Sequence, residues 1–180
     1  MRQSKKIALS AMLCALGVAV MAIGVIAPVL DMTVAAICSL IVVLAFVEIG
    51  TPYVQLVWLC TSLLGYIMFP GSSVWLTYFL VFGIFPILKA YIERLPRYVW
   101  LLLKLIFANA AFAVLFLLWE LVFGIGLLDG ESLFGISGVP LLCLVILIMN
   151  VAFVAYDMLI TVMLRIYLFK YRERFKKLFK

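Results

Sequence analysis

The chain has 180 residues, of which 69% are hydrophobic and 12% charged, with a mean hydropathy of +1.34 and a formal net charge of +6. A soluble domain is nearer to half apolar and a quarter charged, so this composition indicates a protein dissolved in lipid. His is absent, which excludes a histidine general base and a histidine metal site. Neither a GxxxxGK[ST] nor a GxGxxG motif occurs. We therefore expect an integral membrane protein that is not an enzyme and that carries no cofactor and no metal.

Six apolar segments follow one another along the chain, and each approaches the roughly 20 residues that a membrane-spanning helix needs. The breaks between them hold turn residues such as Gly50-Thr51-Pro52 and Pro70-Gly71. The first segment is too long for the apolar part of a typical signal peptide, so we expect it to be retained. The sequence predicts an all-α integral membrane protein, a single six-helix transmembrane bundle over 1–180. Its spans are expected at about 7–27, 32–50, 53–69, 74–92, 98–123 and 139–165.

The basic residues indicate how this bundle is oriented. With six spans and the N-terminus inside, all 14 Lys and Arg residues fall on the inner side: three in the N-terminal tail, four in or beside the loop 93–97, and seven from Arg165 onward. The outer loops instead carry Asp31, Asp129 and Glu131. Because Lys and Arg mark the cytoplasmic side of a membrane protein, both termini are predicted to be cytoplasmic. The positive charge then reflects topology, and we expect no nucleic-acid partner.

The C-terminal tail, 166–180, combines apolar residues at helical spacing with many basic ones. Leu168, Tyr171, Phe175 and Leu178 form the apolar stripe. This pattern is typical of a basic amphipathic helix that lies on the anionic lipids of the inner leaflet. Alternatively, the last span simply continues into the cytoplasm and its basic cluster sets the topology.

Alanines recur at spacings of three or four along the first span. Such a stripe allows another helix to approach closely, and close packing drives helix association in lipid. The stripe either packs within this bundle or docks a partner membrane protein. Its members are Ala8, Ala11, Ala15, Ala19 and Ala22.

Two oppositely charged residues are expected at similar depth inside the spans. Lys104 lies about two turns into the fifth span, and Asp157 about two turns from the inner end of the sixth. Charges inside a membrane are costly and are usually paired or functional. We predict an intramembrane charge pair of Lys104 with Asp157, which Glu48 can share, and a proton or cation relay through Asp157 is the alternative.

Polar residues also lie in the outer half of the last two spans. Asn109 and Glu120 are eleven residues apart and so share a face of one helix, because three turns take about 10.8 residues. Asn150 is expected near mid-bilayer, where an amide needs a partner. The two amides either bond to each other or to backbone, or they line a pocket open to the outside together with Glu120, Trp119 and Tyr78. The glycine-rich segment 124–138 is then either a lid or only a connection.

Pro86 lies in the interior of the fourth span. Proline has no N–H group and its ring clashes with the preceding turn. We therefore expect a kink at this point and a carbonyl group that lacks its helical donor.

The N-terminal run KKIALSAMLCALG, from Lys5 to Gly17, resembles the opening of substrate-binding S components of energy-coupling factor (ECF) transporters. The resemblance implies a six-helix protein of the bacterial cytoplasmic membrane that captures vitamins or other micronutrients from outside. It also implies that Ala11, Ala15 and Ala19 dock onto a transmembrane coupling subunit, and that two separate ATPases drive the cycle. Substrate binding in the outer half, among helices 4 to 6, agrees with the polar set above.

The sequence also departs from that family. The connection between the first two spans is very short, whereas many S components cover the ligand with a longer one. No signature of a named vitamin is present, and the absence of His argues against nickel or cobalt. A substrate-binding subunit for micronutrient uptake is the predicted function. A non-transporting membrane interaction or scaffold protein, or a small proton-coupled carrier that uses Asp157, is the alternative.

Overall fold

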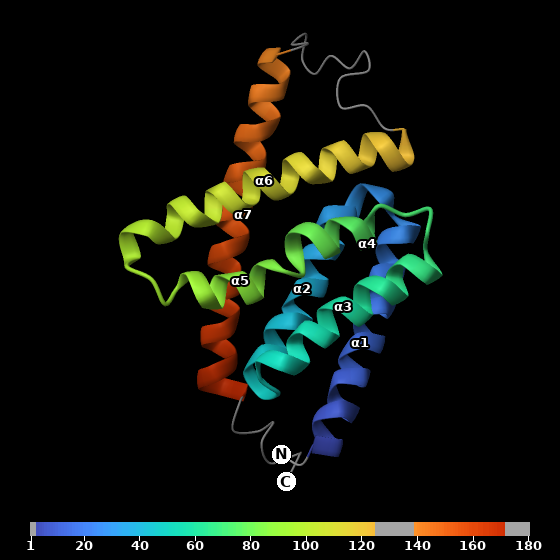
Figure 1. Ribbon diagram of the computed structural model, residues 1–180, viewed down its shortest axis with the longest axis vertical. Coiled ribbons are helices and arrows are strands. Elements are labelled where there is room, and N and C mark those ends of the chain that lie inside the picture. The colour runs from blue at the N-terminus through green and yellow to red at the C-terminus, as the bar shows by residue number, and fades with distance from the viewer. Residues whose placement is uncertain (1–2, 125–138, 172–180) are drawn as a thin grey trace. The chain divides into compact units, whose positions relative to one another are not determined.

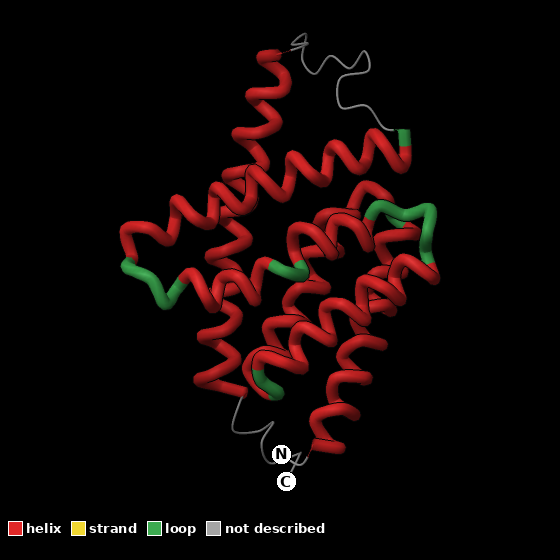
Figure 2. Tube along the Cα trace, viewed as in Figure 1, coloured by secondary structure: helices red, strands yellow, loops and turns green. Residues whose placement is uncertain are grey.

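A computed structural model describes residues 3–124 and 139–171. These residues form helices joined by short loops and contain no strand, as Figure 2 shows. The all-helical class predicted from the sequence is therefore confirmed. The α-helices, labelled in Figure 1, are α1 (Gln3–Ile26), α2 (Asp31–Glu48), α3 (Thr51–Met68), α4 (Val74–Thr77), α5 (Phe85–Ile92), α6 (Arg97–Phe123) and α7 (Val139–Ile166).

The chain divides into two compact units. The first unit contains α1 to α4, the beginning of α5 up to Leu88, and the chain from Tyr156 onward. The second unit extends from Lys89 to Ala155 and contains α6 and the N-terminal part of α7. The single bundle expected over 1–180 stays a prediction.

Within residues 3–124 and 139–171, five stretches of helix are long and apolar enough to cross a membrane, namely Gln3–Ile26, Asp31–Glu48, Val74–Ile92, Arg97–Val122 and Pro140–Lys170. Several long apolar helices are thus present, as expected of a multi-pass membrane protein. The third predicted span does form a helix, α3, but it does not belong to these five. Its sequence includes polar residues that lower its hydropathy, among them Gln55, Thr61 and Ser62.

The first unit is held together by close approach of α1 to its neighbours. The buried face of α1 includes Gly17 and Gly24. A Cβ atom at Gly17 would lie 2.7 Å from the Cγ2 atom of Thr61 on α3, and one at Gly24 would lie 2.8 Å from the Cγ2 atom of Val74 on α4. Glycines, rather than the alanine stripe, therefore provide the small residues where α1 packs inside its unit.

The fourth predicted span is divided into α4, a π-helical turn at Tyr78–Phe82, and α5. Pro86 cannot donate to the carbonyl group of Phe82, four residues earlier. That carbonyl instead accepts a hydrogen bond of 3.4 Å from the Tyr156 hydroxyl, which also lies within hydrogen-bond range of Ser39 Oγ. The kink and the released carbonyl expected from Pro86 are both confirmed. A π-helical turn was not predicted, and such turns are frequent at functional sites.

Two predictions concern residues outside the described ranges. The proposed lid, 124–138, is described only at Gly124, which ends α6 with a φ of +65°. The amphipathic tail is described only as far as Tyr171, where a π-helical turn from Tyr167 ends. The lid at 124–138 and the lipid-binding tail at 166–180 therefore both remain predictions.

The contact between Gly17 and Thr61 gives a test of this packing. Gly17→Ala places a methyl group against Thr61 Cγ2, and Thr61→Ser removes that atom. We expect Thr61→Ser to lower the free energy of unfolding in the native chain, because it leaves a small void, but to raise it in the Gly17→Ala chain. The coupling between the two substitutions should be about 1 kcal/mol. Denaturant unfolding in detergent measures it, and strictly additive effects would contradict the packing described.

Candidate functional site

A groove with a volume of about 530 Å³ lies between α6 and α7 in the second unit. The residues that line it recur at spacings of three and four on each helix, so each helix contributes one continuous face. Asn109 and Glu120 are the polar members of this lining. The walls between them are apolar and are formed chiefly by Phe112, Phe116, Leu142, Val145, Ile146 and Met149.

Asn109 and Asn150 join the two helices by a reciprocal pair of hydrogen bonds. Each side-chain amide donates to the other's Oδ1 atom over 3.0 Å. Asn109 donates its second amide hydrogen over 2.8 Å to the carbonyl group of Leu105. Asn150 does the same, over 2.8 Å, to the carbonyl group of Ile146, so each acceptor lies four residues earlier in the chain. All four amide hydrogens are thereby used. Of the alternatives left open by the sequence, mutual bonding of the two amides is what the structure contains.

Glu120 lies near the C-terminal end of α6, eleven residues beyond Asn109. At 1.5 Å per residue, the two are separated by roughly 16 Å along the helix. Glu120 is exposed and is the one ionisable side chain among the described residues that line the groove. The groove thus has a carboxyl group toward one end, an amide oxygen toward the other, and apolar walls between them.

The other predicted binding residues have different positions. The Trp119 ring packs edge-on against Phe116, with 5.7 Å between the centroids, and its indole nitrogen is buried without a hydrogen-bond partner among the described residues. Tyr78 belongs to the first unit, where 1% of its surface is exposed. Neither residue lines the groove.

Sequence reasoning missed the walls of the groove. Phe112, Phe116 and Met149 were not singled out, because apolar residues are ordinary on a membrane helix. Their spacing from the polar residues was the available signal: Phe112 and Phe116 lie three and seven positions after Asn109, and Met149 directly precedes Asn150. A helical wheel centred on the Asn109–Glu120 face would have identified the aromatic pair.

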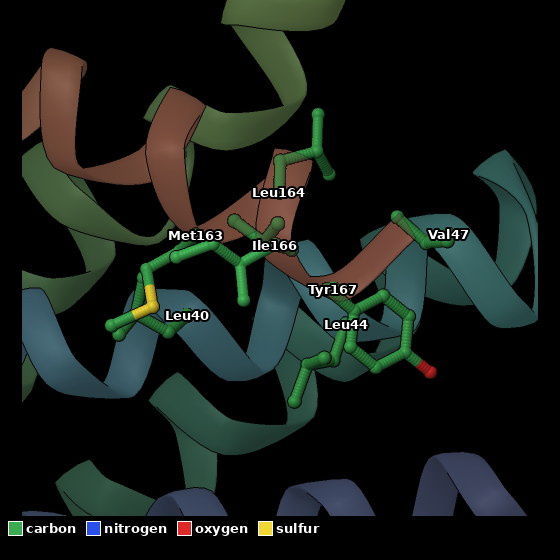
Figure 3. A pocket seen from close by; sticks show the side chains of 8 residues that line it. Leu40, Leu44, Val47, Met163, Leu164, Ile166 and Tyr167 are labelled. Carbon is green, nitrogen blue, oxygen red and sulfur yellow. The ribbon is translucent and has the colours of Figure 1, made fainter. Parts of the chain in front are cut away.

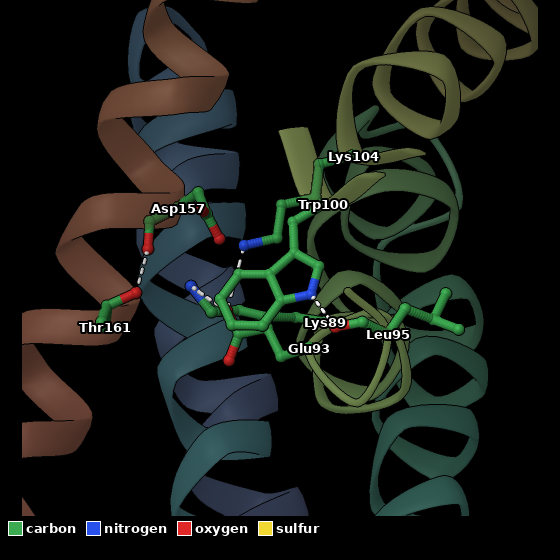
Figure 4. A network of polar contacts seen from close by, with 7 residues as sticks. All are labelled: Lys89, Glu93, Leu95, Trp100, Lys104, Asp157 and Thr161. Atoms are coloured by element: carbon green, nitrogen blue, oxygen red, sulfur yellow. Dashed lines mark hydrogen bonds and ion pairs between the residues drawn. The ribbon is translucent and has the colours of Figure 1, made fainter. Parts of the chain in front are cut away.

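A second polar cluster lies at the start of α6, within the same unit. The Glu93 carboxylate is 3.0 Å from Lys104 Nζ and 3.5 Å from Lys89 Nζ. Both lysine side chains are buried. Lys104 Nζ also lies 5.9 Å from the centre of the Trp100 ring, and these residues are drawn in Figure 4. A buried ion pair of this kind needs both partners, because removal of one leaves a charge in a medium of low polarity.

This cluster bears on the charge pair predicted for Lys104 and Asp157. The structure gives Lys104 a partner that the sequence did not suggest, Glu93. Asp157 belongs to the other unit, where its backbone carbonyl accepts a hydrogen bond of 2.9 Å from the Thr161 hydroxyl. The pairing of Lys104 with Asp157 stays a prediction. Within the described ranges, no group of three or more metal-binding side chains is found.

Among the described residues of the first unit, two apolar cavities stand out. One, of about 220 Å³, lies between α2 and the C-terminal end of α7 and is shown in Figure 3. It is closed in part by Tyr167, whose hydroxyl donates to Glu48 over 3.0 Å. The other, of about 350 Å³, is lined by aromatic residues of α3, α4 and the π-helical turn, among them Trp58 and Trp75. Both are almost wholly apolar, so neither offers the convergent polar groups of a specific solute site.

The alanine stripe of α1 lies on the side opposite to the buried glycines. Ala11, Ala15 and Ala19, predicted to dock a partner, are all exposed. Ala8 is also exposed and Ala22 is half-buried. Packing of this stripe inside the first unit, the simpler of the two interpretations, is therefore not what the structure contains.

Comparison with models of protein families, with curated proteins and with solved structures finds no match to this chain. The chemistry of its own residues therefore has to carry any statement about function.

The amide pair gives a prediction for the site. Asn109→Leu leaves the Asn150 amide without its partner, and we expect the free energy of unfolding to fall by about 1 kcal/mol, as for other interhelical hydrogen bonds in membranes. Asn150→Leu should act alike, and the double variant should cost clearly less than the sum of the two. Denaturant unfolding of the four chains in one detergent completes the cycle. Additive losses would show that the two amides do not interact.

Proposed function

We propose that this protein is a substrate-binding membrane subunit of a bacterial micronutrient uptake transporter. Its substrate site is the groove between α6 and α7, and the alanine face of α1 docks onto a transmembrane coupling subunit. The observation that carries the proposal is the groove itself, which lies on the two helices where the sequence concentrates its outer polar residues. Separate ATPases would supply the energy, because this chain contains neither nucleotide-binding motif sought above.

The dimensions of the groove support this proposal. Its volume of about 530 Å³ falls within the range of roughly 300 to 1,000 Å³ that is typical of small-molecule sites. Such sites are mostly apolar and carry a few polar groups that fix the ligand's orientation. Asn109 and Glu120 provide such groups, and the reciprocal bonds of Asn109 with Asn150 hold its oxygen in place.

The surface of α1 supports the docking role. An exposed stripe of alanines presents a shallow, smooth face on which a second helix can pack closely. The buried glycines of α1 already serve packing inside the first unit, so the alanines are available for a different neighbour. A helix face that contacts only lipid does not need to be so smooth.

We further propose six membrane spans with both termini in the cytoplasm. The additional span is α3, whose 18 residues cover about 27 Å at 1.5 Å each, close to the roughly 30 Å of the hydrocarbon core. Its polar residues Thr61 and Ser62 are buried inside the first unit. Its exposed surface is mainly apolar, with Leu56, Leu63 and Ile67 among its members. Hydropathy averaged over all faces therefore understates how well α3 suits lipid.

The scaffold alternative also has an observation in its favour. The mutual bonding of Asn109 and Asn150 is what would be expected of residues that only hold two helices together. A scaffold, however, has no use for a carboxyl group at the end of an open groove. Mass spectrometry of molecules retained after mild purification separates the two: a small solute supports the transport subunit, and only lipid and protein partners support the scaffold.

The docking face yields a direct prediction. Ala15→Trp places a large ring in the middle of the smooth face, so we expect it to abolish co-purification of the coupling subunit and to reduce uptake at least tenfold. The matched control is Leu16→Trp, because Leu16 is the next residue of α1, is 52% exposed and lies about 100° around the helix. Both variants should remain folded and inserted. Pull-down and uptake assays in whole cells provide the measurement. Equal behaviour of the two variants would refute docking through the alanines.

The proposed topology is tested separately. If α3 crosses the membrane, reporters fused to the two termini should both be active in the cytoplasm, and a cysteine introduced at Arg94 should be labelled only after the membrane is permeabilised. The test is made in a chain whose four native cysteines are replaced by alanine. If α3 does not cross, the two termini lie on opposite sides, and one reporter reports the outside.

A further inference from the structure

We infer that the groove between α6 and α7 takes an organic cation: a molecule with an ammonium or similar hydrogen-bond-donating group beside an apolar, preferably aromatic, body. The inference rests on the proposed function in that it treats this groove as the solute site, and it adds the chemical class of the solute. The inference is based on the polar side-chain atoms that line the groove.

The charge of the groove lining favours a cation. Among the described residues lining the groove, Glu120 is the one ionisable side chain, and the lining includes no Lys or Arg. Glu120 is exposed at the rim of a groove with apolar walls, and its carboxylate attracts a cation more strongly as a ligand displaces water from the groove. A carboxylate or phosphate ligand would instead meet a like charge with no cation among these residues to offset it.

Hydrogen bonding points in the same direction. Both amide hydrogens of Asn109 are used, one by Asn150 Oδ1 and one by the Leu105 carbonyl group. Its oxygen accepts one bond from Asn150 and retains a second lone pair. A carboxylate such as the side chain of Glu120 also only accepts hydrogen bonds. The groove therefore presents acceptors at both of its polar positions, and a ligand has to bring the donors.

The walls define the rest of the ligand. Phe112 and Phe116 lie between the two polar positions, and the faces of aromatic rings attract cations. The remaining wall residues are aliphatic or methionine, which suit an apolar body. The roughly 16 Å between Asn109 and Glu120 leave room for a molecule with one ring and a short chain.

A metal ion does not satisfy these conditions. Calcium and magnesium ions require six or more oxygen ligands at 2.0 to 2.6 Å, including waters. The groove lining provides one carboxyl group and one side-chain amide, which are separated along α6 by three helical turns. An organic cation needs only one close carboxylate and can use the aromatic walls as well.

Three probes of the same shape test the inference: 4-phenylbutylamine, 4-phenylbutanol and 4-phenylbutyrate. They carry an ammonium, a hydroxyl and a carboxylate group on the same apolar body. Binding to the purified full chain is measured by calorimetry in one detergent at one micelle concentration, and each probe is also titrated into protein-free micelles so that its own partition is subtracted. We expect the amine to bind at least tenfold more tightly than the alcohol, and the carboxylate to bind most weakly.

Variants at Glu120 locate the effect. Glu120→Gln should reduce amine binding at least tenfold without affecting the alcohol, and Glu120→Lys should reverse the preference, so that the carboxylate binds best. The matched control is Glu48→Gln, which removes a carboxyl group in the other unit and should leave all three affinities unchanged. Circular dichroism and gel filtration confirm that each variant is folded.

The outcomes distinguish this inference from the proposed function. Equal affinity for amine and carboxylate, or an amine affinity that Glu120→Gln leaves intact, overturns the inference, even if the docking and uptake tests succeed. If amine binding depends on Glu120 as expected but Ala15→Trp and Leu16→Trp behave alike, the inference stands and the transport role fails.

Discussion

The scarcity of water around these helices is the constraint on which the rest of the structure depends. A polar group inside a bilayer cannot be satisfied by solvent, so it has to find a partner within the protein. The carbonyl group that Pro86 deprives of a donor is reached by the Tyr156 hydroxyl. The amides of Asn109 and Asn150 satisfy each other. Each of these bonds fixes the position of one helix against another, so the cost of unpaired polar groups specifies the packing.

Small residues provide the second element of specificity, and α1 uses two kinds of them on two faces. At Gly17 and Gly24 a single added methyl carbon would lie less than 3 Å from a side-chain methyl group, so a larger residue there would force the neighbouring helix or side chain to shift. The alanines of the other face meet no such limit, and Ala15 at their centre is exposed. Glycine therefore marks contacts that are already formed, whereas exposed alanine marks a surface on which close packing remains possible. The distinction is visible only once the helix has been placed against its neighbours.

Much of the fold could be predicted from hydropathy, because the length of an apolar segment and its flanking turn residues directly reflect the bilayer. The residues of every predicted span are largely helical. Hydropathy, however, indicates how deep in the membrane a residue lies and not toward which side of its helix it points. It suggested Asp157 as a partner of Lys104 on the ground of equal depth, which stays a prediction, but it did not suggest Glu93, which it assigned to a loop and which lies 3.0 Å from Lys104. In the same way it identified Asn109 and Glu120 by their polarity but not Phe112 between them, since an apolar wall is indistinguishable in sequence from a lipid-facing one.

The polarity of the groove also has a consequence for Glu120. A carboxylate on a helix surface in contact with lipid is costly, whereas one at the rim of an aqueous or ligand-filled groove is not. The two amides at the other end carry no such cost, because their hydrogens are already bonded. If the groove takes the organic cation inferred above, the amide end is already satisfied without it, whereas the Glu120 end would be stabilised by its positive group. Such an asymmetry would orient the ligand before any shape selection by the walls, since a reversed ligand would place its charge against Asn109 and leave Glu120 facing an apolar chain. Orientation by a single carboxylate requires the amide end to stay neutral and rigid: side-chain amides carry no charge, and the reciprocal bonds with Asn150 hold the Asn109 amide in place.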